Sequence, residues 1–288
     1  MTALPSLFLS HGSPMIALEP GEAGHFMQRL GPVIDATFGR PKAVVVMSPH
    51  TATRSTIVLG GAQHSTIHDF GGFPAPLYEV LYDAPGAPEL SKEVYGLIRS
   101  AGLQVQWTPQ GGLDHGIWTA LMHLYPKVDV PIVPVSLVPT WSAAQTMAMG
   151  RVLAGLREQG VLVVGSGSLT HNLRRFFTQP SPVDAPEAAD CAAFRGWVLE
   201  RAQTGQWDDL LAWDTHAPHA HQMHPTDDHW LPFYFAAGAG ETAAGEPPQA
   251  VRIHGSVTYG HLAMDAYAFG PEAATLAQAL AKVEPQAA

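Results

Sequence analysis

The segment Ala43-Val44-Val45-Val46-Met47-Ser48-Pro49-His50 decides the fold, because a short apolar run rich in valine leads straight into a histidine. Two other segments repeat this pattern. Leu7 to Ser10 runs into His11, and Val161 to Ser166 leads after a few small residues to His171. Short apolar runs with many β-branched residues are typical of strands. The three segments therefore predict three strands, each with a histidine near its end.

Further runs of the same kind alternate with helix-like stretches. Two more strands are expected, at Thr56 to Leu59 and Ile132 to Leu137. Helices are expected at Pro88 to Ser100, Trp141 to Gln159, Ala189 to Ala202 and Pro271 to Ala281. This alternation predicts an α/β fold, a single domain over residues 1–288 with a central mixed sheet flanked by helices.

Two stretches rich in loop-forming residues interrupt the alternation. Gln179 to Ala189 contains three prolines, and Ala236 to Ala250 is rich in Ala, Gly, Glu and Pro. Such composition is typical of loops. The second stretch is expected to be an exposed loop that precedes another strand.

The composition excludes several classes of protein. The chain has 288 residues, of which 46% are hydrophobic and 14% charged, and its formal net charge of -10 comes without a basic stretch for nucleic acid. No apolar run approaches the roughly 20 residues that cross a bilayer. The opening MTALPSLFLSHGSP lacks a basic segment before its apolar residues, which predicts a cytoplasmic protein. The single cysteine, Cys191, is expected to be structural, and a homo-oligomer is left open.

The position of the histidines points to a metal. Ligands of open α/β sheets gather beyond the carboxyl ends of the strands, so His11, His50 and His171 are expected to converge on one pocket. A single histidine is more often an ordinary hydrogen-bonded residue. Three in the same position favour a metal site at the carboxyl ends of the strands, because imidazole is the commonest metal ligand.

Three further motifs surround this pattern. Gly111 to Gly116 places glycines around Asp114 and His115, which allows the backbone to come close to a site. The segment His216 to His229 contains five histidines, and is either a solvated metal-binding tract or an element anchored by the apolar residues after His229. The loop Thr66 to Pro74 has two aromatic residues and a histidine, and is either an ordinary turn or a cover for a flat organic substrate.

Together these motifs resemble the DOPA-type branch of the class III extradiol ring-cleaving dioxygenases, the superfamily that includes the LigB-like enzymes. The matching segments occur in the family's order and span most of the chain. They are His11 to Met15, Ser48 to His50, Thr66 to Pro74, Gly112 to Gly116 with Trp118, Ser166 to Ser168 with His171 to Leu173, and His229 with Leu231-Pro232.

The resemblance implies roles for individual residues. His11, His50 and His229 are expected to bind the metal, and His171 to act as the acid/base catalyst or as a fourth ligand. His115 is expected to orient the substrate or oxygen. In the covering loop, His68 and Phe73 are expected to contact the substrate. The role of His224, five residues before His229, stays open.

The implied reaction inserts O2 into a small catechol, such as a DOPA-like compound, and opens its ring to a semialdehyde. Fe(II) is the expected working metal, and Zn(II) suits the same all-histidine ligands. Neither nicotinamide nor flavin is required. Two alternatives remain: a zinc hydrolase of small amides or esters, with Asp114, Asp227 or Asp228 as its base, and a non-catalytic metal-binding protein of the same fold.

Overall fold

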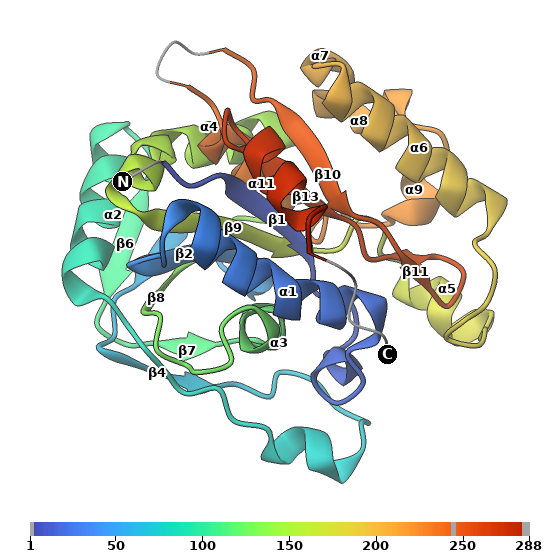
Figure 1. The fold of residues 1–288 in the computed structure, drawn as a ribbon, viewed down its shortest axis with the longest axis horizontal. Coiled ribbons are helices and arrows are strands. Elements are labelled where there is room, and N and C mark those ends of the chain that lie inside the picture. The colour runs from blue at the N-terminus through green and yellow to red at the C-terminus, as the bar shows by residue number, and fades with distance from the viewer. Residues whose placement is uncertain (1–2, 243–245, 284–288) are drawn as a thin grey trace.

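A mixed sheet forms the centre of the computed structural model, which describes residues 3–242 and 246–283 (Figure 1). Its strands are β1 (Ser6–Ser10), β2 (Ala43–Ala52), β3 (Thr56–Leu59), β6 (Val105–Thr108), β8 (Ile132–Leu137), β9 (Val161–Gly167), β10 (Ala250–His254) and β13 (Ala266–Phe269). Their order across the sheet is β10-β13-β1-β9-β2-β8-β3-β6. Two small sheets lie outside it, and consist of β4 (Gln63–Thr66), β5 (Ala84–Pro85) and β7 (Gly112–Leu113), and of β11 (Val257–Thr258) and β12 (Leu262–Ala263).

The four strands β1, β9, β2 and β8 run parallel to one another. Strand β13 is antiparallel to β1, and β3 is antiparallel to β8, so the sheet is mixed as predicted. All five predicted strands belong to it. Strand β2 extends beyond the predicted Ser48 and includes His50. The carboxyl ends of the parallel strands meet at one edge, which brings His11 and His50 to the same side of the molecule.

Helices cover both faces of the sheet. One face packs against α1 (Gly21–Phe38), α3 (His115–Leu124) and α11 (Ala273–Leu280), and the other against α2 (Pro88–Ser100), α4 (Ala143–Val152) and α10 (Leu231–Ala239). Successive side chains of a strand point to opposite faces, so Val44 and Val46 belong to the first core and Val45 and Met47 to the second. The continuous apolar run of β2 follows from this double burial.

The remaining helical segments are short, apart from one. They are η1 (Pro14–Ala17), η2 (Ala75–Glu79), η3 (Ala154–Gln159), α5 (Leu173–Thr178), α6 (Ala189–Gln203), α7 (Trp207–Leu211), α8 (Trp213–His216) and α9 (Ala220–Met223). The single helix predicted from Trp141 to Gln159 is divided into α4 and η3. Helix α4 begins at a capping box formed by Ser142 and Gln145, and Gly160 ends η3 in the left-handed region, at φ 82°.

The prediction of an exposed loop from Ala236 to Ala250 is wrong at its start. Ala236, Ala237 and Ala239 are fully buried within α10. Small residues allow two helices to come close together, and here they bring α10 against α4. Residues 243–245 of the predicted loop lie outside the described part of the chain, and β10 begins at Ala250.

Two predictions made from the composition, about Cys191 and about membrane spans, can be compared with the structure. Cys191 is buried in α6, and burial raises the pKa of its thiol to about 12, so it stays protonated and unreactive at neutral pH. Among the described residues, every helix is too short or too polar to span a bilayer.

Gly238 tests the close packing of α10 on α4. A Cβ atom added there would lie 1.9 Å from the carbonyl oxygen of Met147, which belongs to the backbone of α4. We expect Gly238→Ala to lower the free energy of unfolding by about 1–3 kcal/mol through overpacking. Urea denaturation checks this, with Gly196→Ala in α6 as the control, because a Cβ at Gly196 meets no atom within 4 Å. Equal urea midpoints for Gly238→Ala and the wild type would contradict the packing described.

Candidate metal centre

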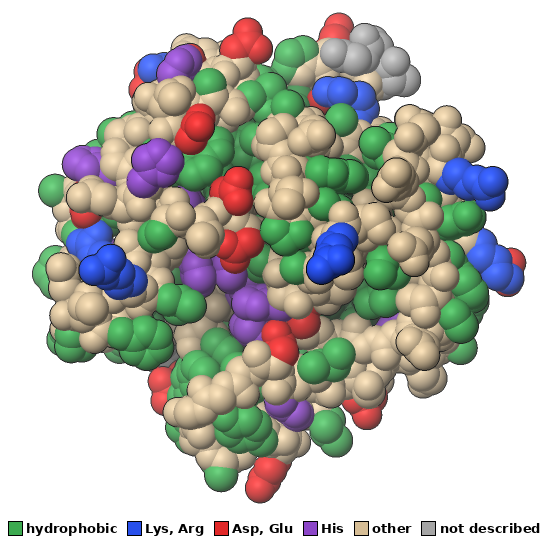
Figure 2. All heavy atoms as spheres, turned by 180° about the vertical axis from the view of Figure 1, so that it is seen from behind, with side chains coloured by type: hydrophobic (Ala, Val, Ile, Leu, Met, Phe, Trp, Pro, Cys, Tyr) green, Lys and Arg blue, Asp and Glu red, His purple; other side chains and the backbone are tan. Residues whose placement is uncertain are grey.

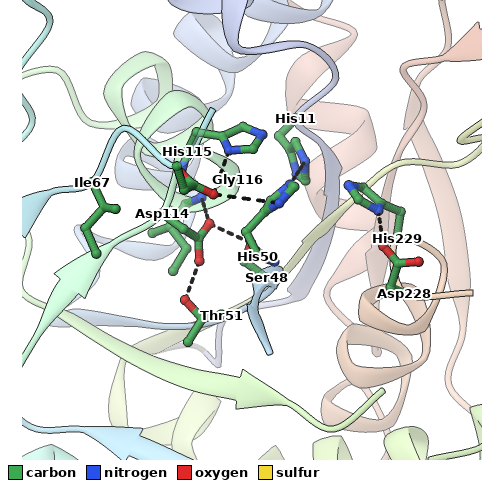
Figure 3. A network of polar contacts seen from close by, with 12 residues as sticks. His11, Ser48, His50, Thr51, Ile67, Asp114, His115, Gly116, Asp228 and His229 are labelled. Carbon is green, nitrogen blue, oxygen red and sulfur yellow. Dashed lines mark hydrogen bonds and ion pairs between the residues drawn. The ribbon is translucent and has the colours of Figure 1, made fainter. Parts of the chain in front are cut away.

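Three histidines converge at the carboxyl edge of the sheet. His11 follows β1, His50 lies near the end of β2, and His229 lies two residues before α10. A ring nitrogen of each lies within 4.8 Å of a ring nitrogen of the other two. The three rings point toward one another in Figure 3, and Figure 2 shows histidine side chains inside a hollow of the molecular surface. The three predicted ligands therefore meet at one place.

The protein fixes the orientation of the His11 ring. The Ser166 hydroxyl donates to the carbonyl oxygen of Gly116, so it accepts the Nδ1–H of His11 over 3.0 Å. Nδ1 is then the protonated nitrogen, and the lone pair of Nε2 is directed into the site. Ser166 comes from β9, the strand that lies between β1 and β2.

His229 is oriented in the same way by a carboxylate. Its Nδ1 lies 2.6 Å from Oδ2 of Asp228 and donates its hydrogen to it. Burial alone would raise the pKa of Asp228, but the hydrogen bond and charge of His229 outweigh burial and hold this pKa below its usual range. A carboxylate behind an imidazole is a common arrangement at metal sites, because it fixes the tautomer and makes the ligand more basic.

The electrostatics of the converging histidines favour a bound cation. Burial lowers the pKa of His11 well below its usual value, and the neighbouring histidines lower it further. Burial, followed by His115 and His229, lowers the pKa of His50 to about 3. Both rings are therefore neutral at pH 7, yet their Nε2 atoms lie only 3.2 Å apart.

This spacing fits a shared metal ion. Two imidazole nitrogens bound at about 2.1 Å to one tetrahedral ion would lie about 3.4 Å apart, close to the observed distance between His11 and His50. Neutral imidazoles are good ligands of both zinc and iron. The residues present thus fit a divalent transition metal.

Helix α3 comes unusually close to this group. A Cβ atom on Gly116 would lie 2.5 Å from Ser48 Oγ and 3.0 Å from ring carbons of both His11 and His50. Buried Asp114 precedes the helix, and accepts hydrogen bonds from Ile117 N and Ser48 Oγ. Its carboxylate is thus occupied in joining β2 to α3, which does not favour the hydrolase base predicted as an alternative.

His115 begins α3 and faces the same group. Its ring centroid lies 3.8 Å from that of His50. Its Nδ1 lies 3.0 Å from Oδ2 of Asp69, and its backbone N–H donates to Oδ1 of the same carboxylate over 2.8 Å. The ring of Phe70 meets it edge-on, with a centroid distance of 5.6 Å.

His171 lies on the other side of His229. The two rings are stacked, with centroids 3.5 Å apart and planes inclined by 7°. Burial and the neighbouring His229 lower the pKa of His171 to about 2, so its ring is neutral. Within the described residues, His171 groups with Asp228 and His229, and His11 and His50 are outside that group.

The predicted covering loop carries an aromatic cluster. Phe70 lies 5.3 Å from Phe73 and 5.7 Å from His68, measured between ring centroids. His68 Nε2 is 3.0 Å from the carbonyl oxygen of Val80, so this nitrogen holds the loop together. Phe70, which the sequence did not single out, stands between Phe73 and His115.

The histidine-rich segment separates into different environments. His216, His219 and His221 are exposed. His224 is buried, its Nε2 lies 2.8 Å from the carbonyl oxygen of Leu169, and its ring stacks on Trp230. This surrounding indicates a structural role for His224, whereas His229 faces the candidate metal centre.

A family model described as the catalytic LigB subunit of aromatic ring-opening dioxygenase matches residues 5–270. The chain belongs to the LigB family. The predicted family is thereby confirmed, and so is the predicted class of enzyme, an oxidoreductase that cleaves aromatic rings in the extradiol manner.

Relatives of this LigB chain match it along most of its length. A 4,5-DOPA dioxygenase extradiol of Beta vulgaris is 34% identical over 270 residues, which cover 92% of this chain and 96% of the relative. A protein of the same name from Escherichia coli K12 is 36% identical over 264 residues, which cover 91% and 93%. The crystal structure of an uncharacterized Escherichia coli K12 protein matches with a TM-score of 0.72 at 29% identity, over 93% of this chain and 100% of the other.

The sequence pattern did not identify the residues that form hydrogen bonds with the histidines of the site. Ser166 is a polar residue inside an apolar strand, which is a usable signal for a buried contact. Asp69 and Asp228 each stand next to a histidine in the sequence, but only Asp228 bonds to its immediate neighbour. Which ring a carboxylate faces depends on the fold.

Asp228 tests the orientation of His229. We expect Asp228→Asn to weaken Zn(II) binding by about 10- to 100-fold, because the carboxylate charge behind the ligand is lost. Calorimetric titration of metal-free protein with zinc measures this. Asp227→Asn is the matched control, being the same substitution at the adjacent residue, and should bind zinc as the wild type does. Unchanged affinity in Asp228→Asn would contradict the assigned role.

The buried neutral imidazoles also predict how stability depends on pH. The pKa values of His11, His50 and His171 lie below the ordinary 6.5 in the folded protein. The unfolded chain therefore binds more protons as the pH falls below about 6.5. We expect the metal-free protein to lose stability continuously from about pH 6.5 toward pH 4, measured by urea unfolding. His171→Asn should reduce this dependence, and stability that is constant or higher in acid would contradict it.

Proposed function

We propose that the chain uses O2 to open the ring of a small catechol at a metal held by His11, His50 and His229, with Fe(II) as the working ion. The convergence of three imidazoles carries this proposal, since the rings of His11 and His229 also direct a lone pair into the site. Relatives named 4,5-DOPA dioxygenase extradiol support a DOPA-like catechol as substrate. Zn(II) is expected to occupy the same site, because neutral imidazole suits both ions.

A divalent ion bound there would supply positive charge that lowers the pKa of the catechol hydroxyl groups. His171 is the acid/base residue of the proposal rather than a fourth ligand, since it stacks beside His229 and away from His11 and His50. A neutral imidazole carries one lone pair, which can take a proton from the substrate. His115 is the residue that orients the substrate.

The aromatic side chains of the covering loop suit a flat substrate ring. Phe70 and Phe73 form an apolar wall next to His115, and partly buried aromatic side chains offer flat surfaces for stacking. Phe73 is proposed as a substrate contact, joined by Phe70. His68 is proposed to act in substrate binding by keeping the loop in place, through its bond to Val80.

The other expectations remain predictions: one catalytic domain over residues 1–288, a cytoplasmic location, and a role in the breakdown of aromatic compounds. Assembly as a homo-oligomer stays open. No nucleic acid or membrane partner is proposed. The chemical partners are the catechol and O2.

The deciding experiment is anaerobic reconstitution with Fe(II), followed by exposure to oxygen in the presence of a panel of small catechols. We expect oxygen uptake and a yellow semialdehyde product. His171→Ala should lower kcat by about 10²- to 10⁴-fold with the metal retained, because a proton carrier is lost. His50→Ala should lose the metal itself.

His216→Ala, which changes an exposed histidine, is the control and should behave as the wild type. Full activity in both His50→Ala and His171→Ala would defeat the assignment. Turnover that is the same with and without oxygen would instead favour a hydrolase.

A further inference from the structure

Asp69 is an acidic residue of the covering loop that none of the assigned roles uses. We propose that Asp69 is a positioning residue, which holds His115 in the tautomer with hydrogen on Nδ1 so that Nε2 accepts a hydrogen bond from the substrate. This inference rests on the proposed function, in which His115 faces the substrate.

The two oxygens of the Asp69 carboxylate have separate tasks. Oδ1 accepts the backbone N–H of His115 over 2.8 Å, and Oδ2 lies 3.0 Å from its ring Nδ1. The first N–H groups of a helix have no partner within the helix, so Oδ1 serves as an acceptor at the start of α3. Oδ2 is left for the ring of His115, and lies farther, at 3.8 Å, from Nδ1 of His50.

The chemistry of a carboxylate decides the tautomer. Asp69 receives hydrogen bonds from both the backbone N–H and the ring of His115, and a carboxyl group with such donors is ionised at neutral pH. An ionised carboxylate only accepts hydrogen bonds, which requires Nδ1 of His115 to be the donor. In a neutral ring the hydrogen on Nδ1 leaves a lone pair on Nε2.

That lone pair has no competing partner. In residues 3–242 and 246–283, the only ring nitrogen of His115 engaged in a hydrogen bond is Nδ1. The ring stands between His50, at 3.8 Å, and Phe70, at 5.6 Å, measured between centroids. Figure 3 shows His115 beside His11 and His50. An aromatic ring bound between the metal group and the loop would thus meet an acceptor.

Asparagine at this position would reverse the arrangement. Its amide has one oxygen, which the backbone N–H of His115 requires, and the NH2 group would then face Nδ1. Nδ1 would become the acceptor, and the hydrogen would move to Nε2. His115 could then no longer accept a hydrogen from the substrate, although its position would be unchanged.

Asp83 provides a matched control that bonds to the start of the same loop. Its Oδ1 accepts hydrogen bonds from the backbone N–H and the hydroxyl of Thr66, both over 2.8 Å. It supports the loop as Asp69 does, but the described residues give it no histidine partner. Asp83→Asn therefore reproduces the chemical change without touching a ring.

The test measures the tautomer of His115 by NMR and the kinetics of the enzyme. Zinc-loaded protein labelled with ¹⁵N-histidine is studied by long-range ¹H–¹⁵N NMR, with the His115 signals identified by their loss in His115→Gln. We expect hydrogen on Nδ1 in the wild type and in Asp83→Asn, and on Nε2 in Asp69→Asn. With the ferrous enzyme and a catechol, Asp69→Asn should lower kcat about 100-fold or more while KM changes by less than about threefold.

Each outcome bears on the proposal. Hydrogen on Nε2 in the wild type would overturn it, as would a loss of kcat in Asp69→Asn without a change of tautomer. Should Asp69→Asn not fold, Asp69→Glu, which keeps both acceptor oxygens, must retain hydrogen on Nδ1. The NMR result needs no turnover, so a wild type that opens no catechol but shows the expected tautomer would refute the proposed function and leave the role of Asp69 standing.

Discussion

Buried imidazole nitrogens brought together at one edge of the sheet are the constraint on which the rest of this structure depends. Nε2 of His11 and Nε2 of His50 lie 3.2 Å apart, and burial keeps both rings neutral. Polar ring nitrogens cost free energy when they are buried without a partner. The fold must therefore hold these rings in place, and a cation between them would bind both nitrogens. Catalysis and stability make opposing demands at this point of the chain.

The rigidity comes from three neighbouring strands and one helix. Strand β1 leads into His11, and β2 carries His50. Strand β9 between them supplies Ser166, which orients His11 and is itself bonded to α3. Asp114 joins the same helix to β2. Gly116 is needed where α3 passes the two rings, because any side chain would displace them. The site thus depends on main-chain positions as much as on its histidines.

Much of the fold could be predicted from the sequence, because strands buried on both faces have a distinctive continuous apolar pattern. The division between α4 and η3, and the burial of Ala236 and Ala237, could not, since small residues are equally common in loops and in close helix contacts. The same limit applied to the residues of the site. Histidines after strands were visible locally, whereas the pairing of Asp69 with a ring 46 positions away requires the folded chain.

The hydrogen bonds that orient His11 and His229 have a further consequence. Both join protein groups, through Ser166 and Asp228. They limit the rotation of two ligand rings, so a metal that binds there has less side-chain ordering to impose. A zinc finger gains its fold from its ion. This chain would instead exchange one divalent ion for another without refolding, and the supply of metals in its surroundings would govern which one it carries.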